Sequence, residues 1–184
     1  MKLLFLTGNQ GKLNEAREIM GDGFKIDNKK VDLPEIQSTS VEEVISEKLK
    51  AAYKIVKKPV FCEDTGVYIK NMNNFPGALI KFYLDHVGNK GIAKFNGGSK
   101  VYAETVIGYH DGKDIHFFKG KIDGTIPKKP KGKGFGWDPI FIPKGYKKTF
   151  GELTFEEKNN ISMRAKAFKK FKKHFTWTFF YYIQ

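Results

Sequence analysis

Apolar residues recur along the chain with two spacings, one typical of strands and one typical of helices. Alternating or continuous apolar runs predict strands at residues 2–7, 60–62, 67–69, 101–109, 115–126 and 135–142. Helical spacing predicts helices over 12–20, from Ser40 to Pro59, at 77–86, 88–95 and from Thr154 to Phe175. Strands and helices interleave without a repeat or a long linker. We therefore expect one α/β domain over residues 1–184, built on a mixed sheet.

Short signals predict where several elements begin, end or break. Ser40 with Glu43, and Thr154 with Glu157, have the spacing of capping boxes at helix N-termini. Asp111-Gly112 predicts a hairpin between two strands. Residues 63–66 (Glu-Asp-Thr-Gly) interrupt an apolar run, so we expect a break in that strand.

Composition narrows the class of protein. Forty per cent of residues are hydrophobic and 15% aromatic, enough for a packed core. No apolar run is long enough to span a bilayer, and the apolar start of the chain is too short for a signal peptide. The single cysteine, Cys62, excludes an internal disulfide framework and a cysteine-rich zinc site. We therefore predict a reducing, cytoplasmic setting and no membrane partner.

The charge indicates an anionic partner. The net charge is +13, with +2 in residues 1–92 (14 basic minus 12 acidic) and +11 in residues 93–184 (19 minus 8). Such an excess attracts either a nucleic acid or a small phosphate compound, and charge alone does not distinguish them. Only two of the 33 basic residues are arginines, Arg17 and Arg164, and the lysines are spread over many segments.

The turn Thr7-Gly8-Asn9-Gln10-Gly11-Lys12 joins the first strand to the first helix. Backbone N–H groups at a helix N-terminus attract anions, and Gly8 and Gly11 allow a phosphate to approach the backbone. The glycine spacing is not that of a Walker A loop, and an ordinary turn is the alternative.

Carboxylates suggest a divalent cation. Glu63 and Asp64 lie in the interrupted strand, and Glu35 lies in an extended segment. Oxygen ligands of this kind suit Mg²⁺. A solvated turn explains the Glu63-Asp64 pair equally well.

Aromatic and basic residues near the C-terminal end suggest a base-binding surface. Phe135 and Trp137 have flat faces on which a base can stack, and Asp138 can accept from a ring N–H; a buried core tryptophan is the alternative. Lys158 and Ser162 are four residues apart, so a continuous helix places them on one face, with Arg164 close behind; a solvated face is the alternative. The four histidines lack metal-ligand spacing, and no serine-nucleophile motif is present.

The order of these segments resembles that of one family. The matching residues are Thr7-Gly8-Asn9 with Lys12 and Glu15, Leu33-Pro34-Glu35, Glu63-Asp64-Thr65, Pro76-Gly77 with Lys81, Phe135-Gly136-Trp137-Asp138-Pro139, and Glu157-Lys158 with Ser162 and Arg164. Together they resemble the inosine triphosphate pyrophosphatase family over about residues 2–175.

The resemblance implies an elongated mixed β-sheet flanked by helices, with two lobes and a nucleotide cleft between them. It implies a homodimer that requires Mg²⁺ and hydrolyses ITP, dITP and XTP to the monophosphate and pyrophosphate, without a nucleic-acid partner.

The resemblance also assigns roles by position. Residues Thr7 to Lys12 form the triphosphate cradle, Glu35 and Asp64 bind the metal, and Asp64 is the base for the attacking water. The implied nucleotide contacts are Lys48, Thr65, Lys81, Lys158, Phe135, Gly136, Trp137, Asp138 and Arg164, the last reading the carbonyl at C6 of the base.

One position departs from the family pattern. The family commonly has Ser-His-Arg where this chain has Ser162-Met163-Arg164. A thioether cannot donate a hydrogen bond, so we expect Met163 at the base to reduce the preference for ITP over GTP while hydrolysis is retained.

Three other functions remain open on sequence grounds. They are a nucleic-acid-binding module, a pyrophosphatase for standard or pyrimidine nucleotides, and a structural dimer without a metal.

Overall fold

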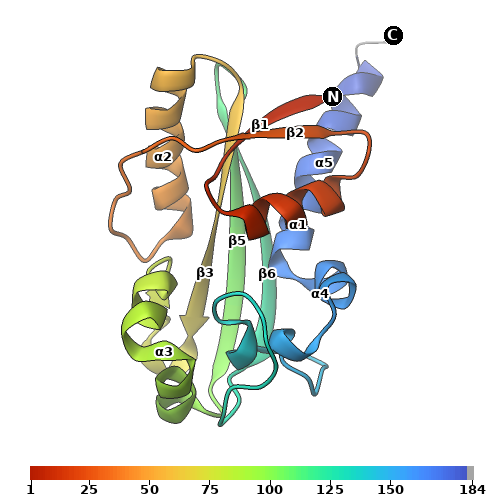
Figure 1. The fold of residues 1–184 in the computed structure, drawn as a ribbon. Coiled ribbons are helices and arrows are strands. Elements are labelled where there is room, and N and C mark those ends of the chain that lie inside the picture. The colour runs from red at the N-terminus through yellow and green to blue at the C-terminus, as the bar shows by residue number, and fades with distance from the viewer. Residues whose placement is uncertain (182–184) are drawn as a thin grey trace.

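The computed structural model describes residues 1–181, and the side chains of residues 1–176. The strands are β1 (Lys2–Leu6), β2 (Lys25–Lys29), β3 (Val60–Ile69), β4 (Pro76–Gly77), β5 (Lys100–His110), β6 (Ile115–Thr125) and β7 (Ile142–Pro143). The helices are α1 (Gln10–Met20), α2 (Val41–Val56), α3 (Ile80–Asn96), α4 (Phe155–Ile161) and α5 (Met163–Tyr181), with short 3₁₀ turns η1 (Lys70–Met72), η2 (Asp138–Ile140) and η3 (Phe150–Glu152). Figure 1 shows their arrangement.

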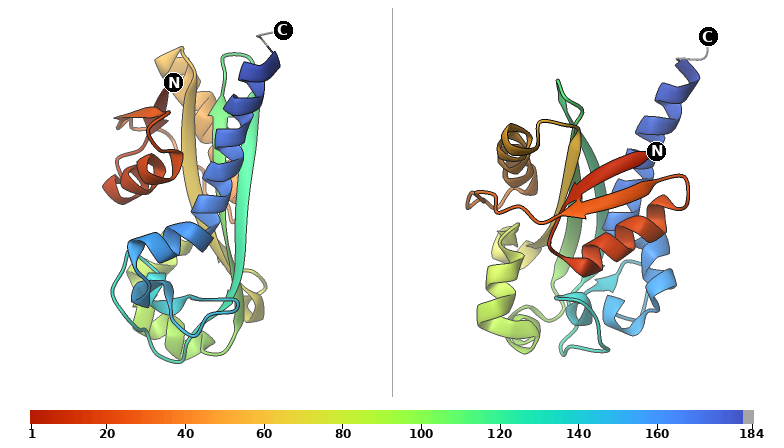
Figure 2. Two further views of the ribbon diagram at one scale, coloured as in Figure 1. Left: turned by 90° about the vertical axis from the view of Figure 1, so that its right-hand side faces the viewer. Right: turned by 45° about the horizontal axis from the view of Figure 1, so that its top comes forward.

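The strands form one open, mixed sheet, as predicted. Its seven strands have the order β2-β1-β3-β5-β6-β7, and β4 also pairs with β3. β1 runs parallel to both β2 and β3, whereas the other pairs are antiparallel. The long strands β3, β5 and β6 run the length of the molecule (Figure 2). The predicted hairpin at Asp111-Gly112 joins β5 to β6.

One edge of β3 has a gap in its pairing. All ten residues of β3 pair with β5 on one side. On the other side β1 reaches β3 only at Phe61, and β4 pairs with Val67 and Tyr68. Residues 63–65 therefore have no strand neighbour on that edge, and their polar groups are available to side chains or to a ligand.

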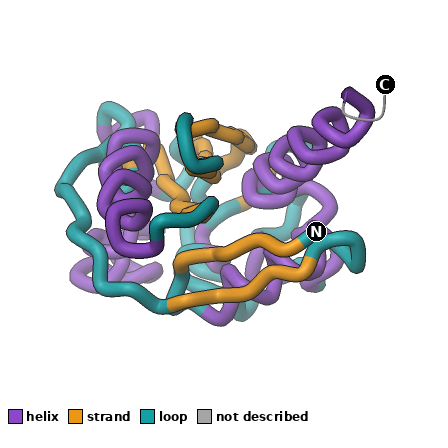
Figure 3. Tube along the Cα trace, turned by 90° about the horizontal axis from the view of Figure 1, so that it is seen from above, coloured by secondary structure: helices purple, strands orange, loops and turns teal. Residues whose placement is uncertain are grey.

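Helices cover both faces of the long strands. α2 packs on one face of β3 and β5, and α5 packs on β5 and β6 (Figure 3). Val60, Cys62 and Val106 belong to the core under α2, whereas Phe61 and Ile107 belong to the core under α1 and α5. This alternation follows from the two-residue period of a strand.

A third core forms the second lobe. Val67, Ile69, Val101 and Ala103 pack there against α3, η2 and η3. Phe61 and Val67 point to the same face of β3 but belong to different cores. The polar residues Glu63 and Thr65 lie between them on that face. One lobe thus contains the two cores on either side of the sheet, the other lobe contains this third core, and the boundary between the lobes is polar. No helix within residues 1–181 has the length and apolarity needed to cross a bilayer.

Two strand predictions were wrong. Residues 63–66 do not break the strand, because β3 is continuous and its acidic side chains are paired with cations. Residues 135–142 form a turn, η2 and the two-residue β7 instead of one strand. β2 had no signal in the sequence, because its five residues are mostly polar.

The helix predictions were correct in place but not in every detail. The N-terminal helix is confirmed as α1, and the two predicted helices at 77–95 are the halves of α3, joined at Gly88. Ser40 caps α2, but Glu43 accepts from Ser38 and so does not complete a capping box. Thr154 and Glu157 do form one.

The last predicted helix is in fact two. Ser162 has extended backbone angles (φ −63°, ψ 157°), so α4 ends there and α5 begins at Met163. Lys158 and Ser162 therefore do not share a helix face. The Ser162 hydroxyl accepts from the Ala165 N–H at 3.1 Å, as an N-cap does. The side chains of the aromatic residues from Trp177 onward lie outside the described residues.

Gly120 sets the approach of α5 to β6. A Cβ at this position would lie 1.9 Å from the Met163 carbonyl oxygen and 2.5 Å from the Ala167 nitrogen, both backbone atoms. We expect Gly120→Ala to lower the free energy of unfolding by about 3 kcal/mol in urea denaturation. Gly23→Ala is the control, because nothing lies within 4 Å of a Cβ there. Equal stabilities of the two variants would contradict this account.

Candidate active site

A cavity of about 850 Å³ lies at the gap in the edge of β3, between the two lobes. It is bordered by the β1–α1 turn, the segment from Lys30 to Ser38, the middle of β3, the start of α3, and the segments around η2, α4 and α5. Predicted site residues that line it are Thr7, Gly8, Asn9, Lys12, Glu35, Lys48, Asp64, Thr65, Lys81, Phe135, Gly136, Trp137, Asp138, Lys158, Met163 and Arg164. The structure thus brings together segments that are far apart in the sequence.

Two predicted residues do not line the cavity. Gln10 is exposed, and its side-chain amide donates to Asn14 Oδ1 at 2.7 Å. Gly11 lies beside it in the first turn of α1. The helix turns both away, so the contribution of this turn comes from Thr7, Gly8, Asn9 and Lys12.

Side chains within the β1–α1 turn fix its shape. Asn9 caps α1, its Oδ1 accepting from the Lys12 N–H at 3.1 Å, and the Asn9 N–H donates to Thr7 Oγ1 at 3.1 Å. The capped turn places the N-terminus of α1 at the cavity, where its dipole favours anions.

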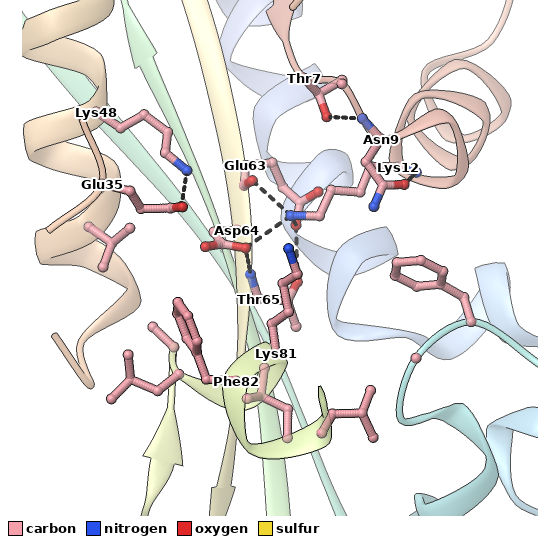
Figure 4. A pocket seen from close by; sticks show the side chains of 18 of the residues that line it. Thr7, Asn9, Lys12, Glu35, Lys48, Glu63, Asp64, Thr65, Lys81 and Phe82 are labelled. Atoms are coloured by element: carbon pink, nitrogen blue, oxygen red, sulfur yellow. Dashed lines mark hydrogen bonds and ion pairs between the residues drawn. The ribbon is translucent and has the colours of Figure 1, made fainter. Parts of the chain in front are cut away.

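Lys12 bridges α1 and the gap in β3 (Figure 4). Its ammonium lies 2.9 Å from Asp64 Oδ1 and donates to the Glu63 carbonyl oxygen at 3.1 Å. A carbonyl at the unpaired edge is thereby satisfied. Although burial alone would raise the pKa of Asp64, the charges of Lys12 and Lys48 and the Thr65 N–H lower it below its usual value. Asp64 is therefore ionised at neutral pH.

A second lysine holds the other predicted metal ligand. Lys48, on α2, donates to Glu35 from the segment that follows β2. Figure 4 shows the Glu35–Lys48 pair and Asp64 facing the same cavity. Both carboxylates therefore have a lysine as counterion.

These carboxylates suit Mg²⁺ by the chemistry of their donor atoms. No group of three or more acidic, histidine or cysteine side chains that could hold a metal occurs within the described part of the chain. Mg²⁺, however, is usually bound by one or two carboxylates together with substrate phosphates and water. Glu35 and Asp64 fit that mode.

A buried series of ion pairs lies beneath the cavity. Arg164 donates from Nε to Glu63 Oε2 at 3.1 Å and from Nη1 to Glu15 Oε2 at 2.5 Å, and its Nη2 donates to Glu63 Oε1 and Thr65 Oγ1. Four of the five guanidinium N–H groups are thus engaged by described residues. The Arg164 side chain is 4% exposed, and despite desolvation the two glutamates raise the pKa of its guanidinium. Its orientation is fixed by the protein.

The series continues toward the aromatic end of the cavity. Lys158 lies 3.3 Å from Glu15 and 2.8 Å from Asp138. Asp138 Oδ2 also accepts from the Phe135 N–H at 3.0 Å, which closes the turn that carries Phe135 and Trp137. Burial raises the pKa of Asp138, and Lys158 opposes this shift.

The aromatic end has one exposed and one anchored ring. Phe135 is 56% exposed and faces the cavity. Trp137 packs against Phe141 and Phe150, with ring centroids 5.4 and 6.2 Å away. Met163 is 1% exposed in the same apolar core and also borders the cavity. A flat exposed ring on a rigid turn is suited to stacking a base.

Sequence reasoning missed the roles of Glu15 and Phe82. Glu15 is buried on the apolar side of α1 and bridges Lys158 and Arg164. The one sign of this role in the sequence was an acidic residue, next to Ala16, on the otherwise apolar face of the helix. Phe82 extends from α3 into the cavity beside Lys81 (Figure 4) and had no signal in the sequence.

Cys62 does not line the cavity. Its side chain is fully buried in the core under α2. Burial raises the pKa of the thiol to about 12, so the nucleophilic thiolate is scarce.

Comparisons with known proteins cover nearly the whole chain. The model of the Ham1 family matches residues 3–174. An inosine triphosphate pyrophosphatase of Schizosaccharomyces pombe is 44% identical over 173 residues, covering 91% of this chain and 92% of that protein. A dITP/XTP pyrophosphatase of Thermococcus kodakarensis is 40% identical over 176 residues, covering 93% and 95%.

Solved structures share the fold. The Ham1 protein of Staphylococcus aureus has a TM-score of 0.76 at 25% identity and covers 97% of this chain and 100% of its own. A HAM1 protein of Coxiella burnetii has a TM-score of 0.83 at 24% identity, covering 96% and 98%, which shows the fold alone.

Glu15 tests the buried ion pairs. Glu15→Gln leaves Arg164 and Lys158 each without one counterion, and we expect it to lower the free energy of unfolding at pH 7 by about 3–5 kcal/mol. Glu18→Gln, at an exposed position on the same helix, is the matched control in urea denaturation. A loss no larger than the control's would show that the bridge is dispensable.

The same variant has a pH signature. Against the opposing effect of burial, Arg164 and Lys158 lower the pKa of Glu15 in the folded protein. Its stabilising contribution is therefore present above the unfolded pKa of about 4.5 and is lost as the pH falls through the lower folded value. We expect the free energy of unfolding to depend less steeply on pH in this acid range for Glu15→Gln than for the native protein.

Proposed function

This chain belongs to the Ham1 family, and on that premise we propose that it hydrolyses nonstandard purine nucleoside triphosphates. The substrates are ITP, dITP and XTP, and the products are the nucleoside monophosphate and pyrophosphate. The observation that carries the proposal is one cavity with three lysines and two carboxylates at one end and an exposed aromatic ring at the other. Such a cavity matches a triphosphate joined to a base.

The lysine-rich end binds the phosphates. Lys12, Lys48 and Lys81 enter it from three different elements, and the capped N-terminus of α1 adds backbone donors. Cations and backbone N–H groups offset the charge of a triphosphate. When phosphate oxygens take over Lys12 and Lys48, the Asp64 and Glu35 carboxylates lose their present partners.

Glu35 and Asp64 are the residues that would hold Mg²⁺. When bound, the metal supplies charge neutralisation to the phosphates and acidifies water. The donor chemistry of the two carboxylates supports this assignment, as does the resemblance of their positions to the family pattern.

Asp64 is the proposed base for hydrolysis. It orients a water molecule toward the α-phosphorus and accepts its proton as the oxygen–phosphorus bond forms. The bond from the α-phosphorus to the oxygen that leads to the β-phosphate breaks, and pyrophosphate leaves. No covalent protein intermediate is needed.

The aromatic end selects the base. Phe135 stacks on the purine, and Asp138 and Arg164 lie at the polar end of the same surface. An arginine N–H left over from the buried pairs can donate to a C6 carbonyl, whereas the amino group of adenine would face it as a second donor. Leaving a buried donor unpaired costs about 1–3 kcal/mol, which disfavours ATP. Met163 offers no hydrogen bond beside it.

We further infer that residues 1–184 act as a single domain in a homodimer, in the cytoplasm and without nucleic acid as substrate. The dimer follows from the family resemblance. The lone cysteine supports a reducing compartment, and the small cavity supports a nucleotide over a polymer.

The first test is pyrophosphate release from ITP, XTP, dITP, GTP and ATP, with and without Mg²⁺. We expect metal-dependent release that favours ITP and XTP, and a loss of at least about 100-fold in kcat for Asp64→Asn, as for removal of a general base. Equal pyrophosphate release from every purine nucleotide would agree with the mechanism and would assign the lost discrimination to Met163. No release from any nucleotide, with salt-sensitive DNA binding instead, would contradict the proposal.

A second test concerns the lysines on the carboxylates. Removing the Lys12 charge in Lys12→Met frees Asp64 of a competing cation, so the ligand-free protein should bind Mg²⁺ roughly tenfold more tightly by calorimetry. The same variant should bind tripolyphosphate more weakly. Lys50→Met is the control, because Lys50 pairs with Glu47 on the exposed side of α2. Unchanged Mg²⁺ affinity in Lys12→Met would show that Asp64 is not a ligand.

A further inference from the structure

α3 is bent at Gly88, and the bend separates two functions of the helix. Gly88 has φ 67° and ψ 163°, outside the helical region, while residues on both sides are helical. A Cβ at Gly88 would meet nothing within 4 Å, so the positive φ is what favours glycine there. The half before the bend carries Lys81 and Phe82 into the cavity, and the half after it begins at Asn89.

Asn89 reaches the segment that carries the exposed aromatic ring. Its side-chain Nδ2 donates to the Gly136 carbonyl oxygen at 2.9 Å. Asn89 Oδ1 is buried and has no hydrogen-bond partner among the described residues. The Gly136 contact is therefore made by a side chain whose other polar atom is buried without a hydrogen bond, which costs free energy. A residue at a solvent-exposed position would not bear that cost.

Gly136 is the central residue of the turn next to Phe135. Its φ is 62°, and residues 131–137 form neither helix nor strand. On one side the Phe135 carbonyl oxygen accepts from the Asp138 N–H at 3.2 Å. On the other side, the Gly136 carbonyl is held by Asn89. The peptide groups on both sides of Cα136 are thus tied to different elements, η2 and α3.

We propose that Asn89 is a positioning residue for base recognition. It acts through Gly136, fixing the direction of the Phe135 ring relative to Lys81 at the phosphate end of α3. The same helix then sets the distance between the base-stacking ring and the triphosphate. This inference rests on the proposed function, because it takes Phe135 as the surface that stacks on the purine.

The test separates the two ends of the ligand. Asn89→Asp keeps the shape of the side chain but places a carboxylate oxygen against the Gly136 carbonyl. Binding of inosine monophosphate, which carries the base, and of tripolyphosphate, which lacks it, is measured by calorimetry, together with KM and kcat for ITP. We expect about tenfold weaker binding of inosine monophosphate and a similar rise in KM, from loss of a hydrogen bond to a buried group. Tripolyphosphate affinity and kcat should stay within about twofold, since Lys12, Lys48 and Asp64 lie on other elements and Lys81 lies on the other side of the bend at Gly88.

Two further variants control for folding. Asn89→Ser retains a donor on a shorter side chain and should be intermediate in KM, which also serves if Asn89→Asp does not fold. Lys90→Ala, at the next and exposed position, should match the native protein.

The outcomes are distinct. Unchanged binding of inosine monophosphate in both Asn89 variants would overturn the proposal, and so would parallel losses of both ligands, which indicate a general structural role. A native protein that neither binds nor hydrolyses any nucleotide would instead refute the proposed function itself.

Discussion

A buried series of alternating charges holds the two lobes in register. In order it consists of Asp138, Lys158, Glu15, Arg164, Glu63, Lys12 and Asp64. These seven side chains come from η2, α4, α1, α5 and β3, so the series connects five of the elements that border the cavity. Four carboxylates against three cations leave the series with a formal charge of −1. Removing water from so many charges is costly, and only close pairing offsets it. Such a series stabilises less than an apolar core would, but it permits one arrangement of the elements, which is what a site built from distant segments requires.

The gap in the edge of β3 explains where this series ends. β1 leaves β3 after Phe61 and β4 joins it at Val67, so the strand between them offers polar groups that no neighbouring strand satisfies. Because side chains alternate along a strand, neighbouring residues of β3 point to opposite sides. Glu63 and Thr65 face the lobe boundary, where Arg164 covers them, and Asp64 faces the opposite side with Lys12 and Lys48 nearby. Glu63 therefore takes part in the buried ion pairs, whereas Asp64 is left at the cavity.

The sequence predicted the architecture well, but it predicted the site only as separate segments. Apolar periodicity and capping residues such as Thr154 located most helices, because these signals are local. The turn at Thr7 and the aromatic pair at Phe135 and Trp137 were found for the same reason. The break at Ser162 and the continuity of β3 through Glu63 were missed. β3 is continuous because residues 63–66 pair with residues 104–107 of β5, about 40 positions away, and no local pattern contains that pairing. Glu15 shows the limit most clearly. Its function lies entirely in two partners near the other end of the chain, and no local pattern contains them.

Cys62 lies two residues before Asp64 on the same strand, yet it is sealed in the core under α2. The chain has no other cysteine. Electrophiles and oxidants that consume accessible thiolates therefore find no target near the carboxylates. The carboxylates and lysines of the cavity therefore have no reactive thiol beside them, and oxidation of a thiol has no route to the cavity lining.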